Sequence, residues 1–381
     1  MKVLIVGKGI TIFRKEFAEN MKKYFDIEFD ILCTGNANHY YNDINKIFNN
    51  IYYIKNNRNL IKRIPKLRVL YNRILIRKII KNLDTYSICH IHSVSPFYGL
   101  IIDDLKRTCK HLVTSYYGSD FYRTTLLEKK LQKKILEKSD VITFTNKKMM
   151  GHFNKFYLNR FKEKTRIIRF GLSPLEHINL FKKKSIKLMR KEFNIPSDAF
   201  VVTCGYKASN ALQVEKILSQ LGLVKNLLPE NVFLILPMTY GEKEVVIKVE
   251  NVLKQLKFNY LIIKQFLSNE NVAKLRLISN VFINVPISDQ LSGSMQEYIY
   301  ANNVILTGDW LPYNIFYENG ISLIKVSSLE EIGEKTVEII RNYGEYKNRN
   351  LESKEKILEL CSWESNAIKW NELYEKLHYE K

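Results

Sequence analysis

Two carboxylates flank a run of small residues in the segment SDQLSGSMQEYIYANNVILTG, which extends from Ser288 to Gly308. Asp289 and Glu297 stand eight positions apart, with Gly293 between two serines in the interval. A carboxylate accepts hydrogen bonds from the hydroxyls of a ribose or another sugar. The free backbone N–H groups at the start of a helix can hold a phosphate. The pattern therefore suits a phosphorylated ligand that is rich in hydroxyls.

The same residues also have a purely structural interpretation. Ser294 and Glu297 have the Ser-x-x-Glu spacing of a capping box, which predicts that a helix begins near Ser294. Glu297 would then only cap that helix, and Asp289 would be a solvated acid in the preceding loop. Spacing alone supports the two interpretations equally.

Alternation of strands and helices along the whole chain supplies the framework for these residues. Strands are expected in the first half at residues 2–6, 29–33, 88–92, 112–116, 141–145 and 167–170. Strands are expected in the second half at residues 200–204, 233–237, 260–263, 281–285, 304–306 and 322–326. This α/β pattern predicts two Rossmann-like domains with parallel sheets. Ligands bind beyond the carboxyl ends of such strands, so we expect the site in a cleft between the domains.

Composition limits the class of protein. The chain has 381 residues, of which 46% are apolar, so it can form buried cores. It contains no apolar run of about 18 residues, and its start is too short for a signal peptide, which predicts a cytoplasmic protein. The five cysteines are far apart and form no Cys-x-x-Cys pair, which predicts free thiols. No Asp-x-Asp motif is present, so neither a metal nor another cofactor is expected.

The positive charge is concentrated in the first half. The formal net charge is +21, and residues 1–178 carry 34 Lys and Arg against 15 Asp and Glu. Such asymmetry indicates that one domain faces a polyanion. A generally lysine-rich proteome is the alternative explanation.

One basic stretch, residues 55–81, has ten Lys and Arg and no acid, with apolar residues interleaved. A basic amphipathic helix of this kind fits an anionic membrane surface. The residues expected to face that surface are Lys62, Arg63, Lys66, Arg73, Arg77 and Lys78. An ordinary helix with a solvated basic face is the alternative. Nucleic acid is not expected as a partner, because no nucleic-acid-binding signature is present.

The segment from Ser288 to Gly308 resembles the donor-binding signature of family 4 glycosyltransferases, which have the two-domain GT-B fold. That signature is Glu, seven residues, Glu, and then a helix and a strand. Asp289 takes the place of the first acid and Glu297 that of the second. The resemblance implies that Asp289 contacts the donor sugar and that Glu297 binds the ribose of the nucleotide. Asn303 stands where the family usually has glycine.

The first half carries three further likenesses. Gly7-Lys8-Gly9 resembles the glycine loop of the family, which lies beside the donor, although a plain strand–helix turn has the same pattern. The strand end at His92 resembles a His-x-His motif, although a histidine in such a strand is often only part of the core.

Residues 114–120 resemble the segment that carries the His-Gly of the family, with Tyr117 in place of that histidine. In the family that histidine lies beside the transferred sugar. The resemblance implies catalytic roles for His92 and Tyr117, and contact of Asp120 with acceptor or sugar. Asp120 as a helix cap is the alternative.

The second half carries likenesses at its strand ends. Gly205-Tyr206-Lys207 resembles the family segment that neutralises the donor diphosphate, with Lys207 as the candidate cation. The stretch Thr239-Tyr240-Gly241 suits a nucleotide contact and, with the residues before it, resembles bacterial fucosamine transferases that act on lipid-linked intermediates. Lys264 is expected near the base. The helix start formed by Ser292, Gly293, Ser294 and Met295 is expected to hold phosphate.

Together these likenesses predict a GT-B glycosyltransferase of surface polysaccharide or glycoconjugate assembly. It would move a sugar from a nucleotide-sugar donor to a lipid-linked or glycan acceptor, without a metal and with retention of configuration, at the inner face of the cell membrane. Residues 1–178 would bind acceptor and membrane, residues 179–360 the donor, and residues 361–381 would form a helix returning to the first domain. A nucleotide-sugar 2-epimerase of the same fold and a non-catalytic partner protein are the alternatives.

Overall fold

The structure, a computed structural model, describes residues 1–35, 43–54, 65–289, 291–349, 351 and 354–380. Its contacts divide the chain into two compact units. The first unit comprises Met1–Gly171 and Trp363–Lys381, and the second comprises Leu172–Ser362. The division therefore lies at residue 171 instead of the predicted 178. Residue 178 lies inside α8 (Pro174–Phe181), whose buried Leu175 and Ile178 pack in a core of the second unit.

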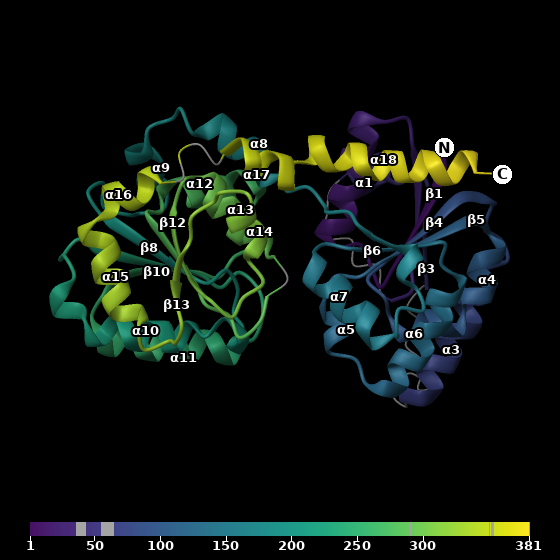
Figure 1. Cartoon of the computed structure of the whole chain (residues 1–381), viewed down its shortest axis with the longest axis horizontal. Coiled ribbons are helices and arrows are strands. Elements are labelled where there is room, and N and C mark those ends of the chain that lie inside the picture. Colours follow the sequence, from purple (N-terminus) through teal and green to yellow (C-terminus); the bar gives the residue numbers. More distant parts are fainter. Residues whose placement is uncertain (36–42, 55–64, 290, 350, 352–353, 381) are drawn as a thin grey trace. The chain divides into compact units, whose positions relative to one another are not determined.

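The first unit contains a seven-stranded parallel sheet in the order β3-β2-β1-β4-β5-β6-β7 (Figure 1). The strands are β1 Lys2–Gly7, β2 Glu28–Cys33, β3 Ile51–Tyr53, β4 Tyr86–His92, β5 Cys109–Ser115, β6 Val141–Phe144 and β7 Thr165–Ile167. In the central pair, Val3 of β1 lies opposite Ile88 of β4. The central strands are apolar on both faces because helices cover both sides of the sheet.

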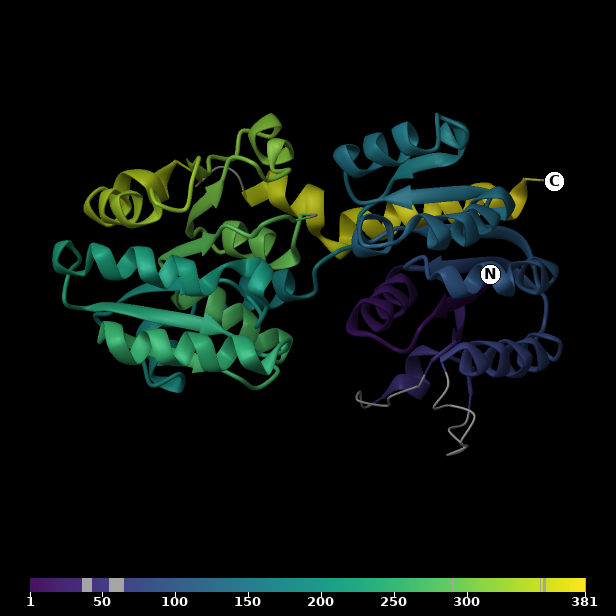
Figure 2. The same ribbon diagram turned by 90° about the horizontal axis from the view of Figure 1, so that it is seen from below.

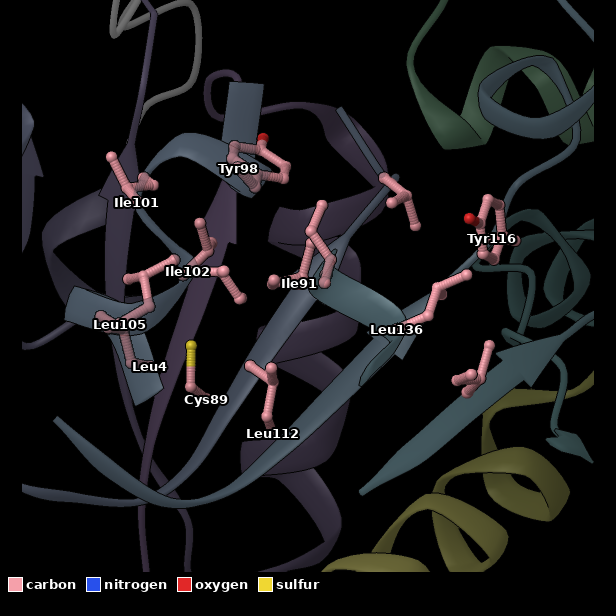
Figure 3. Close-up of a cluster of buried hydrophobic side chains, with 14 of the residues drawn as sticks. Leu4, Cys89, Ile91, Tyr98, Ile101, Ile102, Leu105, Leu112, Tyr116 and Leu136 are labelled. Atoms are coloured by element: carbon pink, nitrogen blue, oxygen red, sulfur yellow. The ribbon is translucent and has the colours of Figure 1, made fainter. Parts of the chain in front are cut away.

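Helices form a layer on each face of this sheet. One layer consists of α1 (Ile12–Tyr24) and α18 (Trp363–Tyr379), which pack on the same apolar cluster. The other layer contains α3 (Pro65–Ile80), α4 (Ile102–Arg107), α6 (Leu126–Lys138) and α7 (Lys147–Phe156). Figure 3 shows the core beneath this second layer, where Leu4, Ile91 and Leu112 from three neighbouring strands meet Leu105 of α4. Figure 2 shows the same ribbon from below.

The last helix of the chain belongs to the first unit, as predicted. Trp370 of α18 is completely buried, and its Nε1 donates a hydrogen bond to the backbone oxygen of Arg169 at 2.9 Å. The hydroxyl of Tyr374 lies 2.6 Å from Nδ1 of His90 in β4. The expectation that this helix returns to the first domain is confirmed.

The second unit contains a six-stranded parallel sheet in the order β10-β9-β8-β11-β12-β13. The strands are β8 Phe200–Cys204, β9 Val232–Pro237, β10 Asn259–Ile263, β11 Val281–Asn284, β12 Val304–Gly308 and β13 Ile324–Val326. The strand order reverses between β8 and β11, so the loops after these two strands diverge to opposite sides. Ligand sites of doubly wound sheets lie at such a point. Gly205 directly follows β8, and Asp289 lies in the loop after β11.

Helices also cover both faces of the second sheet. α10 (Val214–Leu223), α11 (Lys243–Leu256) and α15 (Ile332–Arg341) pack on one face. α8, α12 (Asn269–Ile278), α13 (Gly293–Tyr300) and α17 (Lys354–Cys361) pack on the other. The prediction of two Rossmann-like domains is confirmed. All five cysteines are buried free thiols, and within the described residues no helix is long and apolar enough to cross a membrane.

Candidate functional site

Glu297 forms a buried ion pair with Arg276, a residue that the sequence analysis did not single out. Glu297 lies in α13 and is 7% exposed, and Arg276 lies in α12 and is 5% exposed. Nε and Nη2 of Arg276 lie 3.0 and 2.9 Å from the same carboxylate atom, Oε2. The other oxygen, Oε1, faces Gly293, where an added Cβ would lie 3.5 Å from it. In the described part of the chain no hydrogen bond reaches Oε1, so this oxygen can accept one from a ligand.

The capping box predicted for this helix is wrong. α13 begins at Gly293, and its N-cap residue, Ser292, makes no side-chain capping bond. The Ser294 hydroxyl instead accepts a hydrogen bond from Nη2 of Arg276 at 3.2 Å, and Glu297 is taken by the same guanidinium. A charge-assisted bond to a buried cation is stronger than a neutral cap, so Arg276 draws both side chains away from the helix end.

Asp289 is held in place by a tyrosine that the sequence analysis also missed. Its Oδ2 accepts hydrogen bonds from the hydroxyl of Tyr313 at 2.5 Å and from the backbone N–H of Ser292 at 3.1 Å. The Tyr313 oxygen in turn accepts from Nδ2 of Asn284, at the end of β11, at 3.0 Å. Burial first, and then the charge of Asp289, raise the pKa of Tyr313 well above its usual value, so Tyr313 remains a donor to Asp289.

The start of α13 can bind a ligand through its backbone N–H groups more than through its side chains. Gly293 lies close to Leu172, whose Cδ2 would be 3.0 Å from an added Cβ. Met295, predicted to bind the donor, is completely buried in the apolar core. Its side chain therefore serves packing, and only its backbone N–H can contribute to a phosphate site.

Two glycine turns carry the other predicted donor residues. Gly205 has a φ of +67° directly after β8, and its N–H donates to the oxygen of Ile283 at 3.2 Å. Gly241 has a φ of +124° and pairs with Ala208, whose oxygen would lie 1.9 Å from an added Cβ. Only glycine fits at this position. The pairing places the turn that holds Thr239 and Tyr240 beside the backbone that follows Lys207.

The aromatic side chains of these turns lie near the two acids. Burial first, and then the charge of Asp289, raise the pKa of Tyr206. Burial first, and then the charge of Glu297, raise that of Tyr240, while Arg276 lowers it. The ammonium of Lys207 lies 5.6 Å from the ring of Tyr206. The second unit thus gathers Tyr206 and Lys207 near Asp289, and Tyr240 near Glu297.

Lys264 is not brought into this group. It follows β10, and its Nζ forms an ion pair with Oε1 of Glu250 in α11 at 2.5 Å. Within the described residues no bond joins it to the other predicted donor residues. An exposed lysine after an edge strand pairs with the nearest acid. The sequence could not show that this acid is Glu250, because the two residues are 14 positions apart.

His92 belongs to a buried relay of hydrogen bonds in the first unit. Its Nδ1 lies 2.8 Å from the hydroxyl of Tyr117, and its Nε2 lies 3.1 Å from Nδ1 of His90. His90 in turn contacts the hydroxyl of Tyr374 through Nδ1 and Oγ of Ser115 through Nε2, each at 2.6 Å. Burial lowers the pKa of His90 to about 3 and that of His92 well below its usual value, so both imidazoles are neutral.

Neutral imidazoles allow one consistent direction for the relay. If Nε2 of His90 donates to Ser115, the single lone pair of its Nδ1 is shared between the closer Tyr374 hydroxyl and the more distant Nε2–H of His92. Nδ1 of His92 then accepts the hydroxyl hydrogen of Tyr117. No hydrogen is shared between two acceptors in this arrangement. The Tyr117 oxygen keeps its lone pairs for an outside donor, such as a sugar hydroxyl.

Asp120 organises the loops around this relay instead of facing a ligand. Its oxygens accept hydrogen bonds from the backbone N–H groups of Val94, Tyr117 and Gly118 at 2.8 to 3.2 Å. It is 8% exposed. The structure therefore supports the capping alternative for Asp120, which acts as a positioning residue for Tyr117.

A buried arginine, Arg14, occupies the glycine loop. Its Nη1 donates to the oxygen of Gly9 at 2.7 Å, and its Nη2 donates to the oxygen of His92 at 2.8 Å. An added Cβ on Gly7 would lie 2.1 Å from Nε, so Gly7 is needed to admit the guanidinium. Lys8 is exposed between the two glycines. Arg14 lies on the same face of α1 as Phe17 and Met21. A charged residue on this apolar face was the feature of the sequence that could have predicted a buried arginine here.

The predicted membrane-facing residues are only partly available. Lys62, Arg63 and the side chain of Lys66 lie outside the described residues. The helix itself is present as α3, but Nε of Arg73 donates to the oxygen of Leu100 and Nε of Arg77 pairs with Asp104 at 2.7 Å. Lys78 is exposed. Two of the described cations therefore serve contacts within the unit.

Comparisons with known proteins place the fold. No protein-family model and no curated protein matches the chain. A glycosyltransferase from Rickettsia africae superposes with a TM-score of 0.74 at 16% identity, covering 100% of this chain and 99% of the other. Sucrose-phosphate synthase from Thermosynechococcus elongatus gives 0.73 at 12% identity, covering 100% of both chains. HepE from Anabaena, in complex with UDP-glucose, gives 0.73 at 12% identity, covering 99% and 100%. The shared architecture is the GT-B fold, as predicted.

Proposed function

We propose that the chain is a glycosyltransferase that uses a nucleotide-sugar donor, of the family 4 type. The observation that carries the proposal is the carboxylate of Glu297, with Oε2 bound by Arg276 and Oε1 open beside Gly293. A carboxylate held in this way can accept a hydrogen bond from a ribose hydroxyl without rearranging. The likeness in fold to proteins solved with UDP-glucose supports the same donor class.

The remaining groups of the second unit have roles in this proposal. The diphosphate would lie at the start of α13, where backbone N–H groups and Lys207 stabilise the charge that develops on the leaving group. Asp289, oriented by Tyr313, would accept hydrogen bonds from the donor sugar. The proposal assigns no step to a metal or another cofactor.

The first unit would bind the acceptor, a lipid-linked or glycan molecule of bacterial surface polysaccharide or glycoconjugate assembly. The Tyr117 oxygen, directed by His92, would contact a hydroxyl of acceptor or sugar. Retention of configuration and attachment to the inner face of the cell membrane are also part of the proposal. The excess of positive charge in residues 1–178 supports the membrane location.

Nucleotide binding by the full chain tests the proposal. Nucleoside diphosphates of each base are compared with their 2′,3′-dideoxy forms by thermal shift and calorimetry. One base should stabilise the protein, because a ligand that binds only the folded state raises the free energy of unfolding. Glu297→Gln should weaken that binding by about 10- to 100-fold, since a hydrogen bond to a charged group is lost, and should remove the preference for ribose.

Glu250→Gln is the matched control, because Glu250 pairs with Lys264 elsewhere in the second unit. It should leave binding unchanged. If no nucleoside diphosphate binds, the transferase proposal is wrong. If a nucleotide-sugar alone is converted to its epimer, the chain is an epimerase.

A further inference from the structure

A pocket in the first unit is separate from all the residues discussed above. It lies between α5 (Ser119–Tyr122), α6 and α7 and has a volume of about 570 Å³. Its lining consists of Phe121, Tyr122, Lys129, His152, Lys155 and Phe156. Figure 1 labels the three helices on the same part of the first unit. Three aromatic rings, two lysines and a histidine suit a ligand that combines an anion with apolar groups.

Lys129 is a fixed cation in this pocket. Its Nζ donates to the oxygen of Phe121 at 2.5 Å and lies 3.8 and 4.7 Å from the ring centroids of Phe121 and Phe156. In the described part of the chain no carboxylate forms an ion pair with Lys129 or Lys155. The carboxylate of the neighbouring Asp120 is already bound by backbone N–H groups. The positive charge is therefore held by aromatic faces and has no directly bonded carboxylate in the described part of the chain, while the charge of Asp120 acts on it through space.

The polar edge of the pocket is formed by a tyrosine and a histidine. The Tyr122 hydroxyl lies 2.9 Å from Nδ1 of His152, and the two rings meet edge to face. The other ring nitrogen of His152, Nε2, can donate to a phosphate oxygen when Nδ1 accepts from the tyrosine. The same pocket thus combines a hydrogen-bond donor with two ammonium groups.

Large apolar side chains close in sequence to the pocket residues are exposed. Leu126, Leu127 and Leu158 are 72, 71 and 87% exposed, and Tyr122 and Phe156 are more than 40% exposed. The two leucines at the start of α6 are held by the capping box that Thr125 and Glu128 form. Residues 121–160 carry ten Lys and Arg against three Asp and Glu. Exposed leucines surrounded by cations match the boundary between the headgroups and the acyl chains of an anionic bilayer.

We infer that this face docks the protein on an anionic lipid bilayer, with a lipid phosphate in the pocket beside Lys129 and Lys155. Leu126, Leu127 and Leu158 enter the acyl boundary around it. The inference rests on the membrane attachment proposed above, but it assigns the attachment to α5–α7 instead of α3. It does not depend on the nucleotide site.

Vesicle binding of the full chain tests this inference. The protein is sedimented with vesicles of phosphatidylcholine alone, or with 30% phosphatidylglycerol, at 0.1 M salt. Only the anionic vesicles should retain it, and 1 M salt should release most of it. Lys129→Gln with Lys155→Gln should weaken binding roughly 30-fold, since each basic residue near such a surface contributes about fivefold. Leu126→Ser with Leu127→Ser should weaken it by a similar factor.

The control is Lys183→Gln with Lys187→Gln. These lysines lie in a second exposed basic stretch, in the second unit, which also exposes Ile186 and Leu188 but contributes nothing to the pocket. This control should bind vesicles as the unchanged protein does. If the two double lysine variants lose vesicle binding equally, net charge alone determines binding, and the inference is overturned.

Two further outcomes would also overturn it. In the first, binding is lost on substitution of the exposed Leu70 and Ile74 of α3 but not of the pocket residues. In the second, single-stranded RNA binds through Lys129 and Lys155 while vesicles do not bind. Nucleotide binding in the second unit should persist in every pocket variant, so loss of vesicle binding and loss of the proposed catalytic activity can be told apart.

Discussion

Arg276 and Glu297 lie on different helices and 21 positions apart, yet two guanidinium nitrogens bind one carboxylate oxygen, Oε2. The arrangement leaves Oε1 without a partner in the described part of the chain. A bidentate pair that used both oxygens would have closed the carboxylate to ligands. The one-sided geometry makes Arg276 a positioning residue for Glu297.

Removing Arg276 should destabilise the protein and weaken nucleotide binding. Arg276→Met leaves the buried Glu297 unpaired, which costs about 3–5 kcal/mol of the free energy of unfolding. Arg276→Lys should retain part of the stability but not the ribose preference, because one ammonium cannot hold the carboxylate as a planar fork does. Urea unfolding and calorimetry measure the two effects. A change below about 0.5 kcal/mol in Arg276→Met would contradict the role given to the pair.

The buried histidine pair predicts a pH dependence of stability. The pKa of His90 is about 3 in the folded protein and that of His92 is also lowered, against about 6.5 in the unfolded chain. The unfolded state therefore binds more protons below pH 6.5, so stability falls as the pH falls from 6.5. For His90 this loss amounts to about 2 kcal/mol between pH 6.5 and 5, and His92 acts in the same direction.

Urea unfolding at pH 5 and 7 measures this slope. His90→Gln should reduce it by about half of the contribution of the pair, whatever its effect on stability at neutral pH. An unaltered slope in His90→Gln would show that the relay does not titrate as described.

The hydroxyl of Tyr117 should affect both turnover and stability. Its ring stacks on Phe170 with centroids 5.2 Å apart, and Tyr117→Phe retains that contact while removing the hydroxyl. We expect transfer or donor hydrolysis to fall about 10- to 100-fold, since removing one partner of a buried hydrogen bond costs about 1–3 kcal/mol. The free energy of unfolding should fall by about 1–3 kcal/mol, because Nδ1 of the buried His92 loses its donor. On the proposed likeness to family 4 glycosyltransferases, Tyr117→His introduces the residue usual there and should recover part of the activity. Equal activity in Tyr117→Phe would exclude a role for the hydroxyl.

Gly7 should tolerate no side chain while Arg14 is present. An added Cβ would overlap Nε of Arg14 at 2.1 Å, so Gly7→Ala should cost roughly 1–3 kcal/mol through overpacking. In Gly7→Ala combined with Arg14→Ala the clash is absent, and the two losses should not add. Thermal unfolding of the single and double variants measures this coupling. Simple additivity would mean that the glycine serves a ligand or the turn, and not the arginine.

Most strands were predictable because each is a short apolar run that ends at a polar or glycine residue. β3 (Ile51–Tyr53) was missed, because three residues are too few to form such a run. Glu297 was found for a similar reason, since its spacing from Asp289 lies within one local segment. The partner that decides its role could not be found, because Arg276 reaches it through the packing of α12 against α13. Contacts between elements of this kind also explain the failed capping box and the displaced domain boundary.

Asp120 and Lys264 show the same limit at single residues. Asp120 was predicted as a site residue from the resemblance of residues 114–120, and Lys264 from its place at a strand end. Asp120 is instead bound by three backbone N–H groups, and Lys264 by Glu250. The position of a residue at a strand end can be read from the sequence. Whether its side chain turns to a ligand depends on nearer partners that only the fold brings within reach.

The packing of α18 on the first unit has a consequence for synthesis on the ribosome. β1, β4 and α1 are translated early, but the helix that covers His90 and Phe17 ends at Tyr379. At about 5–20 residues per second, roughly 10–40 s pass between translation of β7 and translation of this helix. During that interval the second unit can complete its own core, while the part of the first sheet that α18 covers stays exposed beside α1. We therefore expect the unit translated first to be the last to mature, and a nascent chain stalled before Trp363 to be open to chaperones and proteases at that part of the sheet.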